Sequence, residues 1–239
     1  MLQFHTLASS SAGNAYLATD GQARLGIEAG LPWRQYQLAM KHQVSRLNGV
    51  LVTHQHADHS RAIKDVLKAG VDVYTSDAVA ETIGRSHRLH VLPTNGVAVR
   101  IGDWRVLAFD LIHDVPCIGF LIQGPSGQKL AFITDTGYVP ITLQGIDVLA
   151  VEANYSEPTV QAHVKRGVVD PRQAKRLAQS HLSIEQVLEL VKAVDLRRCR
   201  EIHLLHLSAG NSSARQFKHL LESATGIPTH IAPERGALA

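Results

Sequence analysis

Cysteine is scarce in this chain, with two residues among 239. A small secreted protein held together by disulfides would carry more, so Cys117 and Cys199 do not indicate a disulfide framework. No run approaches 18 consecutive apolar residues, which excludes a membrane-spanning helix. The first twelve residues also lack the basic and apolar regions of a signal peptide. These absences predict a soluble cytoplasmic protein, either bacterial or, if a phage encodes it, located in the host cytoplasm.

An excess of one sign of charge is also lacking, since 24 Lys and Arg nearly balance 21 Asp and Glu and leave a formal net charge of +3. This value is too small to indicate duplex-DNA binding by itself, and it does not repel an anionic substrate. The chain has no internal repeat and no low-complexity tract, which excludes repeat architectures. With 45% hydrophobic and 19% charged residues, the composition is that of an ordinary globular protein. No linker is evident, so a single domain over residues 1–239 is predicted.

The stretch LVTHQHADHS, residues 51–60, contains four potential metal ligands within six consecutive positions. They are His54, His56, Asp58 and His59, placed after an apolar run that predicts a strand and before an amphipathic pattern that predicts a helix. Imidazole and carboxylate together suit divalent ions such as zinc. Side chains two residues apart on an extended segment point the same way, so His54 and His56 are expected to share one ion. Asp58 and His59, past the bend, are expected to reach a second ion. The alternative, a surface loop that happens to be rich in His, does not explain so dense a cluster at a strand end.

A two-ion site needs more than four ligands, and three further residues have the same placement at the end of a predicted strand. His113 follows residues 105–111, Asp135 follows residues 130–134, and His206 ends the strand that begins at Glu201. Each alone would more often be structural, but their shared placement favours a role as ligands. The remaining histidines lack this placement and are predicted not to be ligands: His5, His42, His87, His90, His163, His203, His219 and His230.

Periodicity and turn residues predict two strand-rich halves, each with flanking helices. Such halves favour two sheets packed face to face and covered by helices. The clearest helix, residues 183–194, has Ser183 at its start and one apolar face. Another helix is predicted at residues 60–69. Residues 154–179 are polar and basic and are predicted to be irregular, forming either a lid over the site or a contact between subunits.

The motif THQHADH, followed by a later His, an Asp and a last His, resembles the metallo-β-lactamase superfamily. The resemblance implies an α+β fold, a four-layer αββα sandwich, with two divalent metal ions, most often zinc and in some members manganese or iron. It also implies a homodimer. By this resemblance, one ion is held by His54, His56 and His113, the other by Asp58, His59 and His206, and Asp135 bridges them.

Smaller motifs resemble the nuclease-like and phosphodiesterase-like branch of that superfamily. They are VEANY at residues 151–155, SHLS at residues 180–183, LLHLSAGN around His206, and ASSSAGN at residues 8–14. This branch includes phage anti-Pycsar phosphodiesterases, which destroy cyclic nucleotide signals. Residues 46–83 and the stretch RSHRLHVL at residues 85–92 look particularly like that type. The long arm of the tRNA-processing relatives is missing, which counts against tRNA maturation.

Two metal ions about 3.5–4 Å apart can polarise a water and clamp a phosphodiester. Asp58 is predicted both to bind metal and to orient that water. His181, which no ion needs as a ligand, is the candidate general acid; its alternative is a structural or helix-capping histidine. Ser10, Ser11 and Asn14 are candidates for binding phosphate, although the loop could be simply a tight turn. Asn154 and Tyr155 are candidates for contacting substrate, with packing as their alternative.

The leading hypothesis is therefore a metal-dependent phosphodiesterase that hydrolyses cyclic CMP, UMP, AMP or GMP to the monophosphate and counters antiphage signalling. A second hypothesis is a DNA or RNA exonuclease of the same fold. A third is a hydrolase of non-phosphate substrates: the missing signal peptide argues against a periplasmic β-lactamase, and VEANY with SHLS argues against a thioesterase. A fourth hypothesis is a protein that binds and sequesters a nucleotide without cleaving it. The complete set of metal ligands argues against it, because sequestration needs no activated water.

Overall fold

The computed structural model describes residues 1–140 and 142–233. Residue 141 and residues 234–239 of the predicted domain lie outside the described part. The chain divides into two compact units. Unit 1 comprises residues 1–110, 115–129 and 233, and unit 2 comprises the described residues of 111–114 and 130–232. Among the described helices, none has the length and apolar character needed to cross a membrane.

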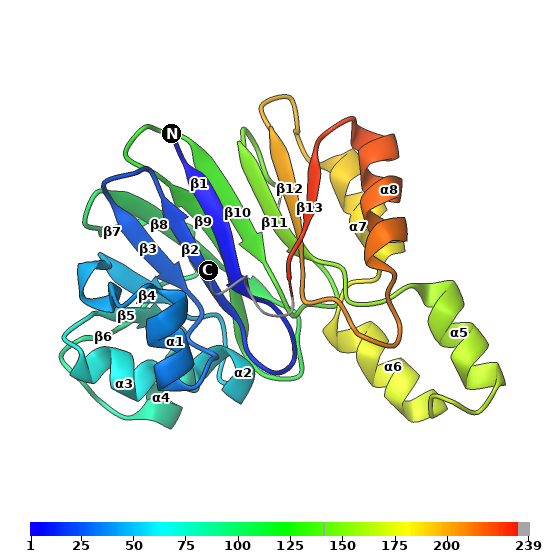
Figure 1. Ribbon diagram of the computed structural model, residues 1–239, viewed down its shortest axis with the longest axis horizontal. Coiled ribbons are helices and arrows are strands. Elements are labelled where there is room, and N and C mark those ends of the chain that lie inside the picture. Colours follow the sequence, from blue (N-terminus) through cyan, green and yellow to red (C-terminus); the bar gives the residue numbers. More distant parts are fainter. Residues whose placement is uncertain (141, 234–239) are drawn as a thin grey trace. The chain divides into compact units, whose positions relative to one another are not determined.

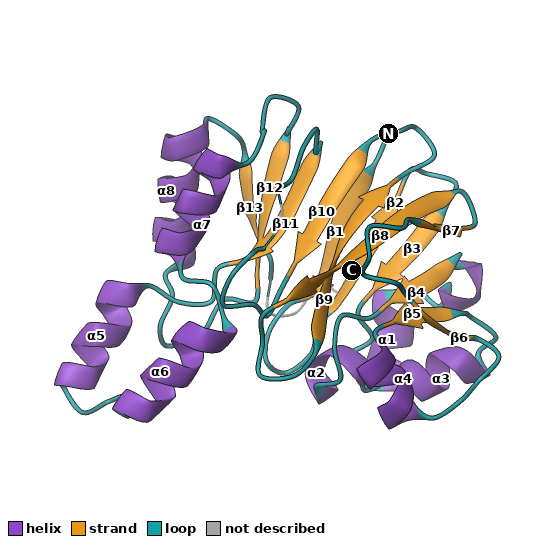
Figure 2. Cartoon of the chain, turned by 180° about the vertical axis from the view of Figure 1, so that it is seen from behind, coloured by secondary structure: helices purple, strands orange, loops and turns teal. Residues whose placement is uncertain are grey.

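Unit 1 is built on a six-stranded sheet in the order β1-β2-β3-β4-β5-β6. Strands β1, β2 and β3 pair antiparallel, whereas β3 to β6 pair in parallel. Helices α1, α3 and α4 gather beside this sheet (Figures 1 and 2), and their apolar side chains, such as Tyr36, Ile63 and Val79, join those of the sheet in one buried cluster. The bounds are β1 Gln3–Ala8, β2 Ala15–Thr19, β3 Arg24–Ile27, α1 Trp33–Ala39, β4 Gly49–Leu51, α2 Ala57–Ser60, α3 Ile63–Lys68, β5 Val73–Thr75, α4 Asp77–Ile83, β6 Leu89–Val91, β7 Val99–Ile101, β8 Trp104–Leu111 and β9 Cys117–Gln123, with a 3-10 turn at Val44–Arg46.

Unit 2 contains strands that pair in parallel in the order β13-β12-β11-β10. Helices α7 and α8 contact each other, and α8 lies along β13, while α5 and α6 form a separate pair (Figure 1). The bounds are β10 Lys129–Ile133, β11 Val148–Glu152, α5 Glu157–Lys165, α6 Pro171–Ser180, α7 Ile184–Ala193, β12 Glu201–Leu205, α8 Ala214–Thr225 and β13 Thr229–Ile231.

Most predicted strands and helices are confirmed to within a few residues. Helix α7 begins as expected, because the Ser183 side chain accepts a hydrogen bond from the Gln186 backbone and the Gln186 side chain accepts one from the Ser183 backbone. This reciprocal pairing is a capping box, which satisfies two backbone donors at the helix start.

One prediction is wrong, and one is confirmed only in part. Residues 154–179 are not irregular but form most of α5 and α6; Pro171 opens α6, and the Asp170 side chain accepts a hydrogen bond from the Arg172 backbone at 2.7 Å. A proline after an Asp is a helix-start signal that the polar composition obscured. The helix predicted at residues 60–69 is confirmed in part as α3, Ile63–Lys68, and a separate short helix, α2, precedes it. They are separated where the Ala62 backbone N–H donates to the Ala29 carbonyl at 2.7 Å, so Asp58 and His59 lie on a helical turn.

Candidate metal-binding site

The parallel pairing of β3 and β4 brings the first group of predicted ligands to one edge of the unit 1 sheet. Ile27 lies opposite Leu51, so Glu28 and the segment Thr53–His54 leave the two strands at the same edge. Glu28 adopts a positive φ of 62°, an uncommon conformation for a residue with a side chain. The turn directs a carboxylate against the ligand segment.

The His54 ring is fixed by a hydrogen-bonded chain that starts at Glu28. The Thr53 hydroxyl donates to Glu28 Oε1 at 2.7 Å, so its oxygen accepts from His54 Nδ1 at 2.9 Å. His54 Nε2 then faces His56 Nδ1 at 3.0 Å. Because Nδ1 of His54 donates to Thr53, its Nε2 carries the lone pair that can bind a metal ion. His54 Nε2 and His56 Nδ1 are close enough for one cation to bind both. This arrangement fits the prediction that His54 and His56 share an ion.

His59 is held between two carboxylates. Its Nδ1 lies 3.3 Å from Glu28 Oε1 and its Nε2 lies 3.3 Å from Asp58 Oδ2, and only 1% of its side chain is exposed. Burial raises the pKa of Glu28, and the neighbouring His59 and Thr53 oppose that rise. A carboxylate behind one ring nitrogen is the usual support of a metal-binding histidine, because it orients the ring and makes the other nitrogen more basic.

The backbone of the ligand turn is clamped from two sides. The carbonyl of Asp58 accepts from the Asn14 backbone at 2.8 Å, and that of His59 accepts from the Ala29 backbone at 2.8 Å. Gly30 makes this approach possible, since a Cβ there would lie 1.5 Å from the Asp58 carbonyl oxygen. The Asn14 side chain, which is fully buried, also donates toward Asp58 Oδ2 at 3.3 Å and lies 3.0 Å from His59 Nε2. Asn14, a candidate for binding phosphate, is thus positioned to orient two predicted ligands.

Replacing Glu28 with Gln is expected to weaken metal binding by about 10–100-fold, the typical effect of removing an outer partner of a metal ligand. Gln keeps an oxygen for Thr53 but removes the charge that supports His59. Competition with a chelating dye measures the affinity. Unchanged affinity in a folded Glu28→Gln variant would contradict this role.

A second group of polar side chains meets at the ends of the parallel strands in unit 2. Ile133 lies opposite Val151, and Glu152 lies opposite Leu205, so Asp135, Glu152 and His206 leave the sheet at the same edge. Asp135 and His206 have φ values of 52° and 51°. Strained backbone of this kind costs about 1–3 kcal/mol per residue and is concentrated at functional sites. Potential ligand atoms of Asp135, Glu152, His181 and His206 all lie within 4.8 Å of one another.

His206 is supported by Asn154, which lies in the VEANY motif. The Asn154 side chain donates to the His206 carbonyl at 2.8 Å and lies 3.1 Å from His206 Nδ1. Asp135 Oδ1 lies 3.4 Å from the same nitrogen. Asn154 in unit 2 therefore supports His206 as Asn14 supports His59 in unit 1.

His181 interacts with two carboxylates through one nitrogen. Nδ1 lies 2.9 Å from Glu152 Oε2 and 3.1 Å from Asp135 Oδ1. Burial lowers the pKa of His181, but the charges of Glu152 and Asp135 and the hydrogen bonds to them outweigh it and raise the pKa to about 10. The imidazolium form is therefore favoured at neutral pH, and Nε2 is left to donate a proton.

His113 lies beside this group and lines a cavity of about 490 Å³. Its Nδ1 donates to the Ser180 carbonyl at 2.9 Å, and its Nε2, the potential ligand atom, lies 3.1 Å from Asp114 Oδ1. Burial lowers the pKa of His113, with the neighbouring Asp135 opposing this, so the neutral imidazole that binds metal is favoured. Arg176 of α6 lines the same cavity.

The remaining candidates for contacting substrate differ in exposure. Ser10 lies in a tight turn, where its hydroxyl accepts from the Ala12 backbone at 3.2 Å, and Ser11 is exposed. Tyr155 is 3% exposed, and burial, followed by the charges of nearby glutamates, raises its pKa to about 12. A phenol this buried favours packing, the alternative to stacking on a base.

Sequence reasoning missed Glu28 and Glu152, the two buried carboxylates behind the histidines. Both have the placement at a strand end that marked the candidate ligands. Glu152 is the last residue of β11, and Glu28 directly follows β3. Glu152 accepts from the Thr136 and Leu182 backbones at 2.6 and 3.2 Å, which ties three segments of unit 2 together.

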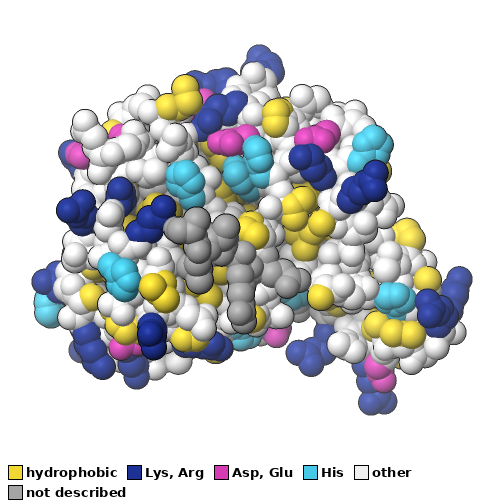
Figure 3. Space-filling view, in the orientation of Figure 1, with side chains coloured by type: hydrophobic (Ala, Val, Ile, Leu, Met, Phe, Trp, Pro, Cys, Tyr) yellow, Lys and Arg dark blue, Asp and Glu magenta, His cyan; other side chains and the backbone are white. Residues whose placement is uncertain are grey.

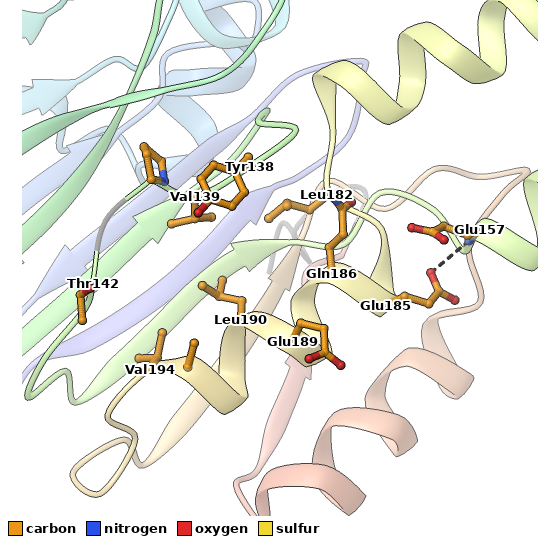
Figure 4. Close-up of a pocket in the computed structure, with 12 residues that line it drawn as sticks. Tyr138, Val139, Thr142, Glu157, Leu182, Glu185, Gln186, Glu189, Leu190 and Val194 are labelled. Carbon is orange, nitrogen blue, oxygen red and sulfur yellow. Dashed lines mark hydrogen bonds between the residues drawn. The ribbon is translucent and has the colours of Figure 1, made fainter.

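The cavity drawn in Figure 4 lies elsewhere in unit 2, against α7, and has a volume of about 590 Å³. Val139, Leu182 and Leu190 are among the apolar side chains that line it, and Glu157, Glu185 and Glu189 line one side (Figure 4). Glu185 also accepts a hydrogen bond from the Glu157 backbone at 3.0 Å. Three carboxylates repel a polyanion, so this cavity does not suit a nucleic acid.

Comparison with known proteins identifies the class. The sequence model of the β-lactamase superfamily domain matches residues 23–204, and the chain belongs to this superfamily. The metallo-β-lactamase fold expected from the sequence is confirmed, with two mixed sheets flanked by helices: the structure of YhfI from Bacillus subtilis has a TM-score of 0.73 at 16% identity, covering 97% of this chain and 96% of that one. With its buried His and Asp clusters, the chain is a metal-dependent hydrolase of this fold.

Two curated relatives are similar over most of their length. Exodeoxyribonuclease YycJ of Bacillus anthracis is 29% identical over 226 residues, covering 88% of this chain and 84% of the relative. Exodeoxyribonuclease WalJ of Streptococcus pneumoniae is 25% identical over 236 residues, covering 91% and 86%. These relatives favour the nuclease hypothesis over the finer resemblance to anti-Pycsar phosphodiesterases, which they do not support.

Proposed function

We propose that the chain is a metal-dependent exodeoxyribonuclease. The observation that carries the proposal is its similarity to two exodeoxyribonucleases over more than four-fifths of each sequence. The buried ligand clusters of both units supply the donors that such a hydrolase needs. Cyclic-nucleotide hydrolysis, the leading hypothesis from the sequence, becomes the alternative.

We assign the seven predicted ligands to two ions as the family resemblance implies. His54, His56 and His113 would hold one ion, Asp58, His59 and His206 the other, with Asp135 shared. Nitrogen-rich ligand sets with a few carboxylates suit zinc, and manganese is the second choice. Two such ions, when bound, would supply charge for the phosphodiester oxygens and lower the pKa of a water.

The chain's own groups would handle the protons. Asp58 is assigned to orient the attacking water, and His181 to protonate the leaving oxygen through Nε2. The contact between His181 Nδ1 and Glu152 at 2.9 Å would keep the ring oriented and charged. A positioned general acid contributes about 10²–10⁴-fold to a rate.

The positive charge of the paired helices α5 and α6 supports the proposal of a polyanionic substrate. Residues 157–180 contain five Lys or Arg and two Asp or Glu, a net charge of +3 that equals that of the whole chain. All five cations are exposed, and every residue of α6 is at least partly exposed. Lys and Arg side chains gather over this helix pair in Figure 3. A cationic surface attracts a phosphate backbone irrespective of sequence, and Arg176 connects this surface to the cavity of His113.

Replacing Arg172 and Lys175 together with Ala is expected to weaken binding of single-stranded DNA. The slope of log affinity against log salt should fall by about 0.7 per lost phosphate contact. Fluorescence anisotropy at several salt concentrations measures both quantities. Lys64→Ala, an exposed cation on α3, serves as the control and should leave the slope unchanged; an equal slope in the double variant would exclude these contacts.

The substrate class is tested by incubating the purified, metal-loaded protein with linear DNA and, separately, with cyclic CMP, UMP, AMP and GMP. Release of mononucleotides from linear DNA, with the cyclic nucleotides intact, supports the proposal. Hydrolysis of a cyclic nucleotide with DNA intact would replace it with the alternative. Circular single-stranded DNA should resist, since an exonuclease requires an end. We also propose the homodimer that the resemblance implies, which light scattering tests.

A further inference from the structure

A second group of metal-binding side chains lies on β12 and β13 of unit 2, outside the ligand clusters described above. The group consists of Glu201, His203 and His230, whose potential ligand atoms all lie within 4.8 Å of one another. Glu201 and His203 are two residues apart on β12, so their side chains point to the same face. His230 is the register partner of His203 on the parallel strand β13. Strand geometry alone therefore brings the three side chains together.

The distances suit joint binding of one ion better than direct hydrogen bonds. Glu201 Oε2 lies 3.5 Å from His203 Nε2 and 3.7 Å from His230 Nε2. These separations exceed the 2.7–3.2 Å of ordinary N–H···O hydrogen bonds. Two ligands bound to the same tetrahedral zinc ion, each about 2.0–2.2 Å from it, lie about 3.4 Å apart. The two imidazole rings are stacked, with centroids 4.9 Å apart.

The surroundings hold the carboxylate in place and balance the nearby charges. Arg200 Nη1 lies 3.0 Å from Glu201 Oε1, which leaves Oε2 for the two histidines. Lys218, a cation on α8, lies 3.6 Å from Glu222, which offsets part of its charge. His203 is 8% exposed, whereas the His230 side chain is 52% exposed. An ion could enter from the His230 side and keep a water as its fourth ligand.

We propose that Glu201, His203 and His230 form a separate binding site for a divalent transition-metal ion, zinc by its donor set. Two imidazoles and one carboxylate are a common protein ligand set for zinc. The ion would join β12 to β13, the terminal strand in the order of its sheet. Sequence reasoning set these histidines aside because it considered only strand ends, whereas these ligands lie side by side along two strands.

The test compares the zinc content and zinc affinity of the full-length protein with those of His230→Ala. After equilibrium dialysis against micromolar zinc chloride, the variant should hold one ion per chain fewer than the parent. Zinc should also raise the unfolding temperature of the parent more than that of the variant. His219→Ala, an exposed histidine on the neighbouring α8, should behave as the parent does.

Glu201→Gln, which retains the size of the side chain, should also lose the ion and provides a second variant. Equal zinc content and affinity in the parent, His230→Ala and Glu201→Gln would overturn the proposal. The inference does not depend on the proposed function, because it rests on a difference of one ion whatever the catalytic clusters bind. Digestion of DNA by His230→Ala at the parent rate would separate this site from catalysis.

Discussion

Replacement of His59 with Ala is expected to reduce DNA hydrolysis by more than about 100-fold and to lower the metal content of the protein. Removing only an outer partner of a metal ligand typically costs about 10–100-fold, and His59 is assigned as a ligand itself. The ring is 1% exposed and lies 3.3 Å from both Glu28 and Asp58. Its loss would leave two carboxylates near each other without the imidazole that separates them. Nuclease assays with elemental analysis measure both effects.

His87→Ala is the matched control, because His87 is an exposed histidine of unit 1 that is predicted not to bind metal. It should retain activity and metal content. Circular dichroism establishes that His59→Ala is folded, since a buried side chain is removed. A folded His59→Ala variant with full activity would contradict the assignment of the ligand.

Replacement of His181 with Ala is expected to lower kcat on DNA by about 10²–10⁴-fold, the usual contribution of a positioned general acid, while metal content is unchanged. A substrate with a nitrophenolate leaving group needs no protonation, so the variant should hydrolyse bis(p-nitrophenyl) phosphate at nearly the parent rate. Equal losses on both substrates would contradict the role of an acid. Loss of metal would instead identify His181 as a ligand, in keeping with its place among Asp135, Glu152 and His206.

The pH profile gives an independent test of the same role. The pKa of His181 is raised to about 10, so the acid form is present throughout the neutral range and is lost as the pH rises through that value. The parent kcat should therefore decline on the alkaline side. In His181→Ala this alkaline decline should be missing, because the group that titrates there has been removed.

The clustering of the candidate ligands could be predicted from the sequence because several of them share a simple placement. These candidates lie just past the end of a strand, and within one sheet parallel strands bring such residues to the same edge. His54, Asp135 and His206 follow β4, β10 and β12 in this way. Such a prediction needs only the periodicity that predicts the strand and a residue type that binds metal, so it requires no knowledge of distant contacts.

Glu28 and Glu152 share the same placement but were not predicted, because a single carboxylate after a strand is not distinctive. Their roles depend on partners far along the chain, Thr53 and His59 for Glu28 and His181 for Glu152. Such pairs become visible only when the register of the strands is known. The side chains that orient ligands are therefore harder to predict than the ligands themselves.

Helices α5 and α6 could not be predicted from the sequence for a different reason. Their polar composition favours an irregular segment, yet both α5 and α6 have Pro at their first turn, and an Asp caps α6. A prediction based on hydrophobic periodicity takes little account of capping residues, although each contributes about 1 kcal/mol to the stability of the helix. The basic segment, predicted to be irregular, therefore forms two helices that carry exposed Lys and Arg side chains.

The most direct test of the central claim is a metal titration of DNA hydrolysis. Protein stripped of metal with a chelator receives zinc or manganese in steps, and the degradation of linear single-stranded DNA is followed at each step. We expect no activity in the stripped protein and no rise in His59→Ala. In the parent, the rise should be complete near two ions per chain, beyond any ion bound at Glu201, His203 and His230. Degradation of DNA at an undiminished rate by the metal-free protein would contradict the central claim.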